Sequence, residues 1–114
     1  MIVGIGIDIV EINRIKKACK NPRFLNKLFT FDEQSYFKER KYNIETIAGR
    51  FAAKEAVVKA LGTGIGKVGW LDIEVLNDKN GRPYIVLYGE ALAALKQSGA
   101  MRLHVSISHA HEYA

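Results

Sequence analysis

The sequence predicts an α+β fold in which a mainly antiparallel sheet packs on one long central helix. Three observations support this prediction. Residues 2–9 and 103–109 alternate with the two-residue period of a strand. The runs 70–78 and 82–89 flank a turn sequence rich in Asp, Asn and Gly, which is typical of a hairpin. A largely apolar helical run spans 44–61.

The composition indicates one ordered domain covering residues 1–114. Hydrophobic residues make up 48% and charged residues 25% of the chain, ordinary values for a globular protein. No apolar run approaches the roughly 18–20 residues of a membrane span, and Asp8 interrupts the N-terminal apolar run. We therefore expect neither a membrane contact nor a signal peptide. The single cysteine, Cys19, suits a reducing compartment, so a cytoplasmic location is expected.

The N-terminal segment predicts a strand followed by a basic helix. In the strand, Gly4, Gly6 and Asp8 share one face and three isoleucines share the other. The two glycines leave room for something to lie close to the backbone. In the helix that follows, Ile12 and Ile15 begin an apolar stripe, and the lysines and arginines point outward.

Capping residues mark the later helices. Asn21-Pro22 predicts the start of a short helix, and Thr30 with Glu33 forms a capping box for a helix over 31–41. Glycines are expected to end the other two helices, Gly62 that of 44–61 and Gly99 that of 90–99. The aromatic residues are expected in the core or in a subunit interface: Phe24, Phe29, Phe31, Phe37 and Trp70.

The net charge of +5 is concentrated in one part of the chain. Residues 14–41 hold nine Lys and Arg against three Asp and Glu, an excess of +6. Such a segment favours a polyanionic partner, although a solvated helical face would have the same composition.

Two charges one turn apart, Glu55 and Lys59, stand among the alanines and valines of the helix 44–61. Glu55 and Lys59 project within about 40° of each other, because four residues make slightly more than one helical turn. A bare buried ion pair would be costly, so the two residues either line a cleft that receives a charged ligand or form an ordinary surface pair. The glycines that follow are not a phosphate loop, since such a loop precedes its helix.

Asp8 adds a second carboxylate to this set. Two carboxylates without a Cys/His cluster suit Mg²⁺ rather than Zn²⁺, and Mg²⁺ commonly completes its shell with water and substrate phosphate. With Lys59 nearby, the residues indicate Mg²⁺-dependent phosphoryl-type transfer or phosphate-ester binding.

Three stretches together resemble a known family. GIGIDIVEINRI near the N-terminus, AGRFAAKEAVVKALGTGIG in the middle and HVSISHAHEYA at the end are similar to the holo-acyl-carrier-protein synthases, the small-type 4′-phosphopantetheinyl transferases. The resemblance implies that fold, and it implies transfer of the phosphopantetheine arm from coenzyme A to a serine of apo acyl carrier protein. The reaction releases 3′,5′-ADP and serves fatty acid biosynthesis. The family usually continues past EYA with another short strand, whereas this sequence ends at Ala114.

The resemblance also implies roles for individual residues. Asp8 and Glu55 would hold Mg²⁺, Lys59 would lie near the coenzyme A phosphates, and Glu55, directly or through a metal-bound water, would be the base, with His109 as a second candidate. Family members are typically homotrimers with the cofactor between subunits. The residues expected to line that cleft are Arg50, Gly62, Thr63, Gly64, the Asn80 to Pro83 turn with Arg82 and Pro83, Ser108 and His109.

The resemblance also implies a binding partner for the basic segment 14–41, because acyl carrier proteins are small and acidic. Complementary charge would mainly raise the rate of association. Arg14 is the strongest candidate by resemblance, and the full set expected at this surface is Arg14, Lys17, Lys20, Arg23 and Lys27.

Two other functions remain alternatives. A basic nucleic-acid-binding module would use residues 14–41 and would leave Asp8 and Glu55 without a role. A Mg²⁺-dependent phosphate-ester hydrolase would use the same carboxylates but would need no carrier protein. His104 and His111 match no motif and are expected on the surface.

Overall fold

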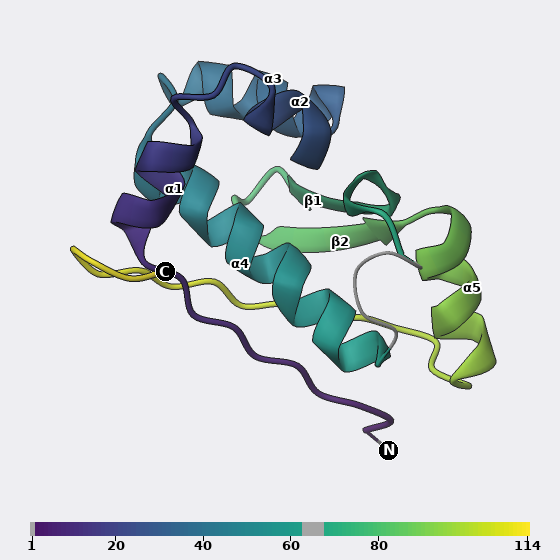
Figure 1. The fold of residues 1–114 in the computed structure, drawn as a ribbon. Coiled ribbons are helices and arrows are strands. Elements are labelled where there is room, and N and C mark those ends of the chain that lie inside the picture. The colour runs from purple at the N-terminus through teal and green to yellow at the C-terminus, as the bar shows by residue number, and fades with distance from the viewer. Residues whose placement is uncertain (1, 63–67) are drawn as a thin grey trace.

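The computed structural model describes residues 2–62 and 68–114. Figure 1 shows a long helix, α4, with a small hairpin behind it, three short helices at one end and α5 at the other. In chain order the elements are α1 (Ile12–Ala18), α2 (Phe24–Leu28), α3 (Phe31–Glu39), α4 (Ile44–Leu61), a 3₁₀ turn η1 (Trp70–Asp72), β1 (Ile73–Asn77), β2 (Pro83–Leu87) and α5 (Gly89–Gln97).

Helix α4 is the central element, and its bounds match the prediction. It begins at the Asn43 cap, whose side chain accepts a hydrogen bond from the Thr46 amide at 3.1 Å. It ends at Gly62, which adopts the left-handed conformation that glycine tolerates best, with φ of 74°. Between these caps, small and β-branched apolar residues let α1, β1 and α5 pack closely against it.

The predicted hairpin is present, with shorter strands than expected. β1 and β2 pair antiparallel, with Ile73 opposite Leu87 and Asn77 opposite Pro83. Residues 70–72 form η1 instead of strand, because the Asp72 carboxylate accepts from the Gly69 amide at 3.2 Å and tightens the chain there. The mixture of helices and a small antiparallel sheet confirms the α+β class.

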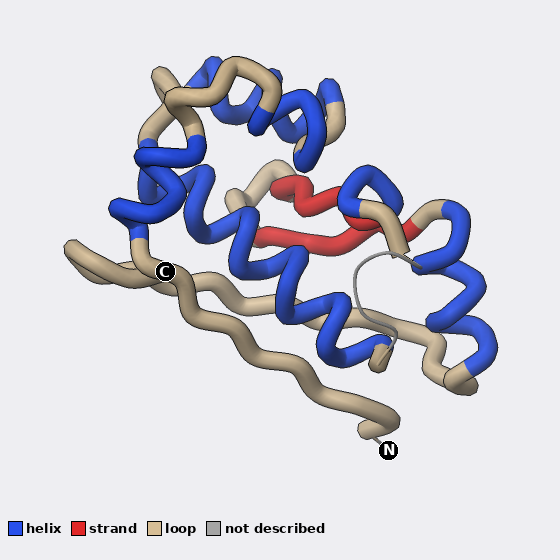
Figure 2. Tube along the Cα trace, viewed as in Figure 1, coloured by secondary structure: helices blue, strands red, loops and turns tan. Residues whose placement is uncertain are grey.

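The two extended segments are not strands of this sheet, which corrects the prediction for 2–9 and 103–109. Figure 2 shows both as irregular chain running beside α4. Within the described residues their pairing is confined to the far ends, where Val10 and Ala114 exchange backbone hydrogen bonds of 2.8 and 3.0 Å. The alternation of side chains along 103–107 is as predicted, but a strand also needs a neighbouring backbone.

Three helices also differ from their predicted bounds. Helix α5 spans Gly89–Gln97 instead of 90–99, and Gly99, with φ of 81°, directly follows its C-cap Ser98. Asn21 does not cap a helix: its side chain accepts from the Arg23 amide at 3.0 Å, which closes a turn, and α2 begins at Phe24. Helix α3 keeps its predicted capping box but stops at Glu39, because the next two residues turn out of the helix.

The aromatic residues pack where α2, α3 and α4 meet. Phe29 and Phe37 lie edge to face at 4.9 Å between ring centroids, and Phe51 stacks on Trp70 at 5.3 Å. Phe31 is the exception, since it is 83% exposed and lies outside the core of the protomer. In the described part of the chain, no helix is both long and apolar enough to cross a membrane.

A buried ammonium group ties these elements together. Lys54 is fully buried, and its Nζ donates to the Glu33 carboxylate at 2.6 Å, to the Leu28 carbonyl at 2.7 Å and to the Trp70 carbonyl at 3.0 Å. Glu33 also accepts from the Val75 amide at 2.9 Å. The ion pair therefore connects α3, α4, β1 and the ends of two other elements.

Because both charges are buried, we predict that Lys54→Met destabilises the fold by about 3–5 kcal/mol, since the Glu33 carboxylate would be left without its counterion. Chemical denaturation measures this. The double variant Lys54→Met/Glu33→Gln should recover part of the loss, because no uncompensated charge remains. A loss below about 1 kcal/mol in the single variant, the range of an exposed pair, would contradict the prediction.

Candidate active site

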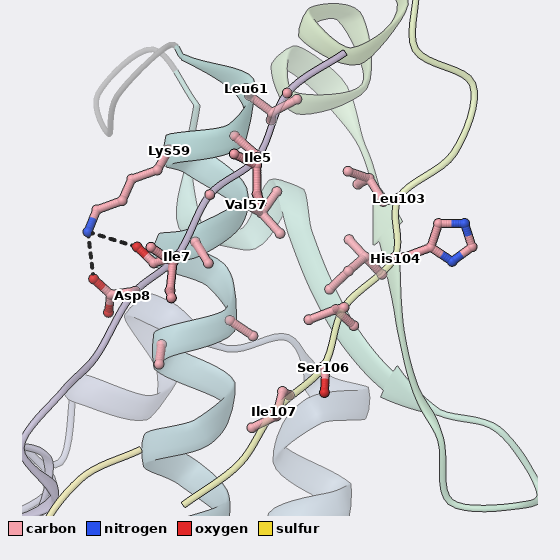
Figure 3. A pocket seen from close by; sticks show the side chains of 18 of the residues that line it. Ile5, Ile7, Asp8, Val57, Lys59, Leu61, Leu103, His104, Ser106 and Ile107 are labelled. Carbon is pink, nitrogen blue, oxygen red and sulfur yellow. Dashed lines mark hydrogen bonds and ion pairs between the residues drawn. The ribbon is translucent and has the colours of Figure 1, made fainter. Parts of the chain in front are cut away.

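The structure brings the predicted residues Asp8 and Lys59 into direct contact. Figure 3 shows the Lys59 side chain reaching from α4 to the N-terminal segment. Its Nζ donates to Asp8 Oδ1 at 2.9 Å and to the Ile7 carbonyl at 3.2 Å. Asp8 is 15% exposed and Lys59 55% exposed, so the pair lies at the edge of the protein with the ammonium group open to solvent.

Glu55 lies one turn before Lys59 on α4, and the charge of Asp8 affects the pKa of its carboxyl group. Partial burial raises the pKa of the Glu55 carboxyl, the Asp8 charge raises it further, and Lys59 opposes both. The hydrogen bond to Asp8 raises the pKa of Lys59, so the ammonium form is favoured. These two carboxylates and the one lysine, which contacts Asp8, together carry an excess of negative charge.

This donor set fits Mg²⁺. Within residues 2–62 and 68–114 no cluster of three or more His, Cys, Asp and Glu side chains is found that could hold a metal by itself. Two carboxylates are nevertheless the usual protein contribution to a magnesium ion that also binds water and substrate phosphate.

Beside the carboxylates, a groove runs along α4 between the two extended segments (Figure 3). Its volume is about 1800 Å³. Small residues such as Gly49, Ala52 and Ala56 form its floor, and residues 2–9 and 103–110 form its walls. Asp8, Lys59, Ser108 and His109 all line it, which brings residues from both ends of the sequence to one surface.

Arg50 faces a different part of the molecule. It is 7% exposed, its guanidinium lies 5.1 Å from the centre of the Tyr36 ring, and its Nη2 donates to the Asn77 side chain. Asn77 in turn donates to the Gly81 carbonyl at 2.9 Å. Arg50 is thus linked to the hairpin turn, and its Nε is buried without a hydrogen-bond partner in the described residues.

Of the other predicted coenzyme A residues, those that lie toward this second region are Arg82, Pro83 and His109. Arg82 and Pro83 line a smaller pocket together with residues 103–107. His109 Nδ1 lies 3.4 Å from Glu45 at the start of α4. Because Glu45 and Lys59 are fourteen residues apart on α4, the two pairs are separated by about 21 Å of helix.

Among the described residues, the chain therefore does not bring all the predicted ones together. Asp8, Glu55 and Lys59 form one set, which we call the carboxylate set. The predicted residues that lie away from this set are Arg50, Arg82, Pro83, Ser108 and His109. Gly62 is the C-cap of α4, as predicted, while Thr63 and Gly64 lie outside the described residues.

The predicted basic surface is exposed on α1, α2 and the turn between them. Its five residues, Arg14, Lys17, Lys20, Arg23 and Lys27, are all exposed, whereas Ile12 and Ile15 are buried beneath them. His104 and His111 are exposed too, as expected.

The sequence did not reveal the buried ion pair of Lys54 with Glu33 or the role of Glu74. Glu74 is 5% exposed and accepts from Thr30 Oγ1 at 2.5 Å and from Tyr88 at 2.9 Å. The available signal was Lys54 itself, a further charge among the apolar residues of this helix, since its direction around the helix differs from that of Glu55 by about 100°.

Comparison with known proteins identifies the family of this chain. Residues 4–111 match the model of the ACPS family, described as the 4′-phosphopantetheinyl transferase superfamily. The chain is 54% identical to the holo-[acyl-carrier-protein] synthase of Alkaliphilus metalliredigens, with an alignment that covers all of this chain and 94% of that protein.

Solved structures show the same fold. The holo-(acyl-carrier-protein) synthase of Bacillus anthracis, in complex with CoA (3′,5′-ADP), is 46% identical with a TM-score of 0.81, covering 99% of this chain and 90% of that one. The Helicobacter pylori enzyme in complex with coenzyme A is 36% identical with a TM-score of 0.81, covering 96% and 92%. Sequence and fold agree along nearly the whole length, and the chain therefore belongs to the holo-[acyl-carrier-protein] synthase family of the 4′-phosphopantetheinyl transferases.

Proposed function

We propose that this chain transfers the 4′-phosphopantetheine arm of coenzyme A to a serine hydroxyl of apo acyl carrier protein, with Mg²⁺ held by Asp8 and Glu55, and releases 3′,5′-ADP. The observation that carries the proposal is the carboxylate set: Asp8 within 2.9 Å of Lys59, with Glu55 one turn earlier on α4. The coenzyme A bound to the Bacillus anthracis and Helicobacter pylori relatives supports the choice of donor.

The reaction requires a base and a group that offsets negative charge. The serine oxygen forms a bond to the β-phosphorus of coenzyme A, and the bond from that phosphorus to the bridging oxygen breaks, so that 3′,5′-ADP leaves. Glu55 is suited to take the serine proton, directly or through a water, because a carboxylate placed beside the attacking hydroxyl can act as a general base. When bound, Mg²⁺ supplies positive charge to the pyrophosphate oxygens.

Lys59 is suited to stabilise the leaving phosphate. Its ammonium group is half exposed and its pKa is raised, so it stays charged and can reach an incoming ligand. A positive charge placed where negative charge develops stabilises the transition state more than the ground state.

The first test is transfer to apo acyl carrier protein, followed by intact-protein mass spectrometry. Wild-type protein with coenzyme A and Mg²⁺ should add one phosphopantetheine arm, and EDTA should prevent this. Asp8→Asn and Glu55→Gln should each lower the rate by roughly 100-fold or more, because each removes a carboxylate that would hold the metal ion. Glu90→Gln, an exposed position on α5, is the matched control and should transfer normally.

The same assay separates the alternatives. Release of nucleotide from coenzyme A without a carrier protein would identify a hydrolase, and full activity in either carboxylate variant would contradict the metal assignment. A nucleic-acid-binding module would show neither reaction.

We also propose that the protein assembles as a homotrimer with active sites between subunits. The N-terminal segment exposes Ile5 by 85%, Ile7 by 83% and Ile9 by 71%, and such a row of apolar side chains favours a protein interface. The unpaired backbones of the extended segments would gain hydrogen-bond partners there. A neighbouring subunit would also supply the residues that one protomer holds apart from its carboxylate set.

Coexpression of two inactive variants tests this arrangement. Glu55→Ala removes the carboxylate set, and Arg82→Ala/His109→Ala removes residues of the second region. If each site combines residues of two subunits, mixed assemblies contain some sites with both sets intact, and transfer activity returns. Coexpressed Glu55→Ala and Asp8→Ala, which damage the same set, are the matched control and should stay inactive. Absence of recovery in the first mixture would contradict shared sites.

The basic surface is proposed to receive the carrier protein, since its five exposed cations lie together on α1, α2 and the turn between them. We predict that Arg14→Glu raises KM for the carrier protein by on the order of 10-fold at low salt, because reversed charge slows association. The KM for coenzyme A should not change. Lys96→Glu, an exposed charge reversal on α5, is the control. Equal KM values for the carrier protein in wild type and Arg14→Glu at low salt would show that Arg14 does not contact the carrier protein.

A cytoplasmic role in fatty acid biosynthesis accords with this partner and is part of the same proposal.

A further inference from the structure

We propose that Gly6 is a positioning residue of the carboxylate set: its missing side chain lets the N-terminal segment lie directly on α4, and this close approach places Asp8 beside Glu55 and Lys59. The inference rests on the proposed function only in assigning a divalent cation to Asp8 and Glu55. It concerns how the Asp8 carboxylate is held in place, since Asp8 lies in a segment that forms neither a helix nor a strand.

The close approach is a contact between two backbones. A Cβ added at Gly6 would overlap the carbonyl oxygen of Ala56 and would lie 2.7 Å from the amide nitrogen of Ala60. A Cβ at Gly4 would lie 3.0 Å from the Ala60 carbonyl oxygen. Neither neighbour is the flexible end of a side chain, so the helix cannot yield locally. Only glycine permits this separation.

This contact lies next to the proposed metal ligands on both elements. On α4, Ala56 and Ala60 directly follow Glu55 and Lys59 in sequence, so the segment crosses the helix beside these charged residues. In an extended chain, residues two apart point the same way, so Gly4, Gly6 and Asp8 all face α4. The distance between Gly6 and α4 therefore determines the distance between Asp8 and α4.

Few other contacts could fix that height. Among the described residues, 2–9 form no backbone hydrogen bonds to other backbone groups, and the first such bond of the segment is that of Val10. Lys59 binds the Ile7 carbonyl and Asp8, but it is a long exposed side chain that can follow a displaced segment. Close packing at Gly6 is the rigid contact.

The size of the disturbance decides the expected effect. An alanine methyl group needs a separation of about 3.5 Å or more from its neighbours, so Gly6→Ala must move the segment by on the order of 1 Å. Metal ligands must stay within roughly 0.2 Å of their preferred distances. Gly6→Ala should thus separate the two carboxylates beyond what one cation can bridge.

The test measures cation binding without coenzyme A or carrier protein, by titrating Mn²⁺ and following the EPR signal of the free ion. Gly6→Ala should bind Mn²⁺ about 10- to 100-fold more weakly than wild type, the loss typical of removing a support of a metal ligand. Gly4→Ala, with the milder contact, should lose less. Thermal unfolding and light scattering confirm that each variant keeps its fold and assembly.

A double-variant cycle distinguishes positioning of Asp8 from a general effect on structure. If Gly6 acts through Asp8, Gly6→Ala in an Asp8→Ala background should weaken Mn²⁺ binding no further, because the ligand it positions is already absent. A further loss of equal size in that background would overturn the proposal, as would wild-type affinity in Gly6→Ala.

If Gly6→Ala does not fold, Gly4→Ala replaces it in the same cycle. A smaller loss of Mn²⁺ affinity that disappears in the Asp8→Ala background supports the proposal, and a loss that persists there overturns it. Absence of Mn²⁺ binding by the wild type would overturn the metal site and this inference together, whereas retained wild-type binding with an unaffected Gly6→Ala would leave the proposed function standing.

Discussion

The buried contact between Lys54 and Glu33 is the interaction on which the rest of this structure depends. Helix α4 has apolar surface in almost every direction, so hydrophobic packing alone would specify its rotation only weakly. The Lys54 ammonium removes that freedom, because its three acceptors come from Glu33, Leu28 and Trp70 and only one rotation of the helix satisfies them all. Burial lowers the pKa of Lys54, and the Glu33 charge opposes this.

Fixing the rotation of α4 determines where its other charges lie. Glu55 and Lys59 point toward the N-terminal segment, while Arg50, five residues before Glu55, projects about 140° away and reaches the hairpin. Helix α4 thus presents the Glu55 carboxylate and the Lys59 ammonium group to the N-terminal segment and the Arg50 guanidinium group to the hairpin. The polar network in the core and the polar groups of the site are two consequences of the same rotation.

The parts of this structure that local sequence determines were predictable. The predicted caps Thr30 and Gly62 act within one turn of the chain, and the hairpin turn is likewise local. The partners of Lys54 were not predictable, because Glu33 is 21 residues away and Trp70 is 16 residues away in sequence. The extended segments failed as predicted strands for a related reason: alternation specifies faces, whereas pairing depends on which backbone lies alongside. Asp8 was grouped with Glu55 and Lys59 on side-chain chemistry alone, but its contact with Lys59 was not predictable, because the two residues are 51 apart in sequence.

The separation of the site residues gives the extended segments a physical role. A segment whose isoleucines were buried within its own chain would have no exposed apolar row to place against another subunit. Here the exposed Ile5, Ile7 and Ile9 lie on the side of the segment opposite Gly4, Gly6 and Asp8. In the proposed trimer, one face would hold Asp8 against α4 while a neighbouring subunit would cover the other. The alternation of a single eight-residue segment would then connect assembly to catalysis, since burial of its isoleucines would hold Asp8 in place.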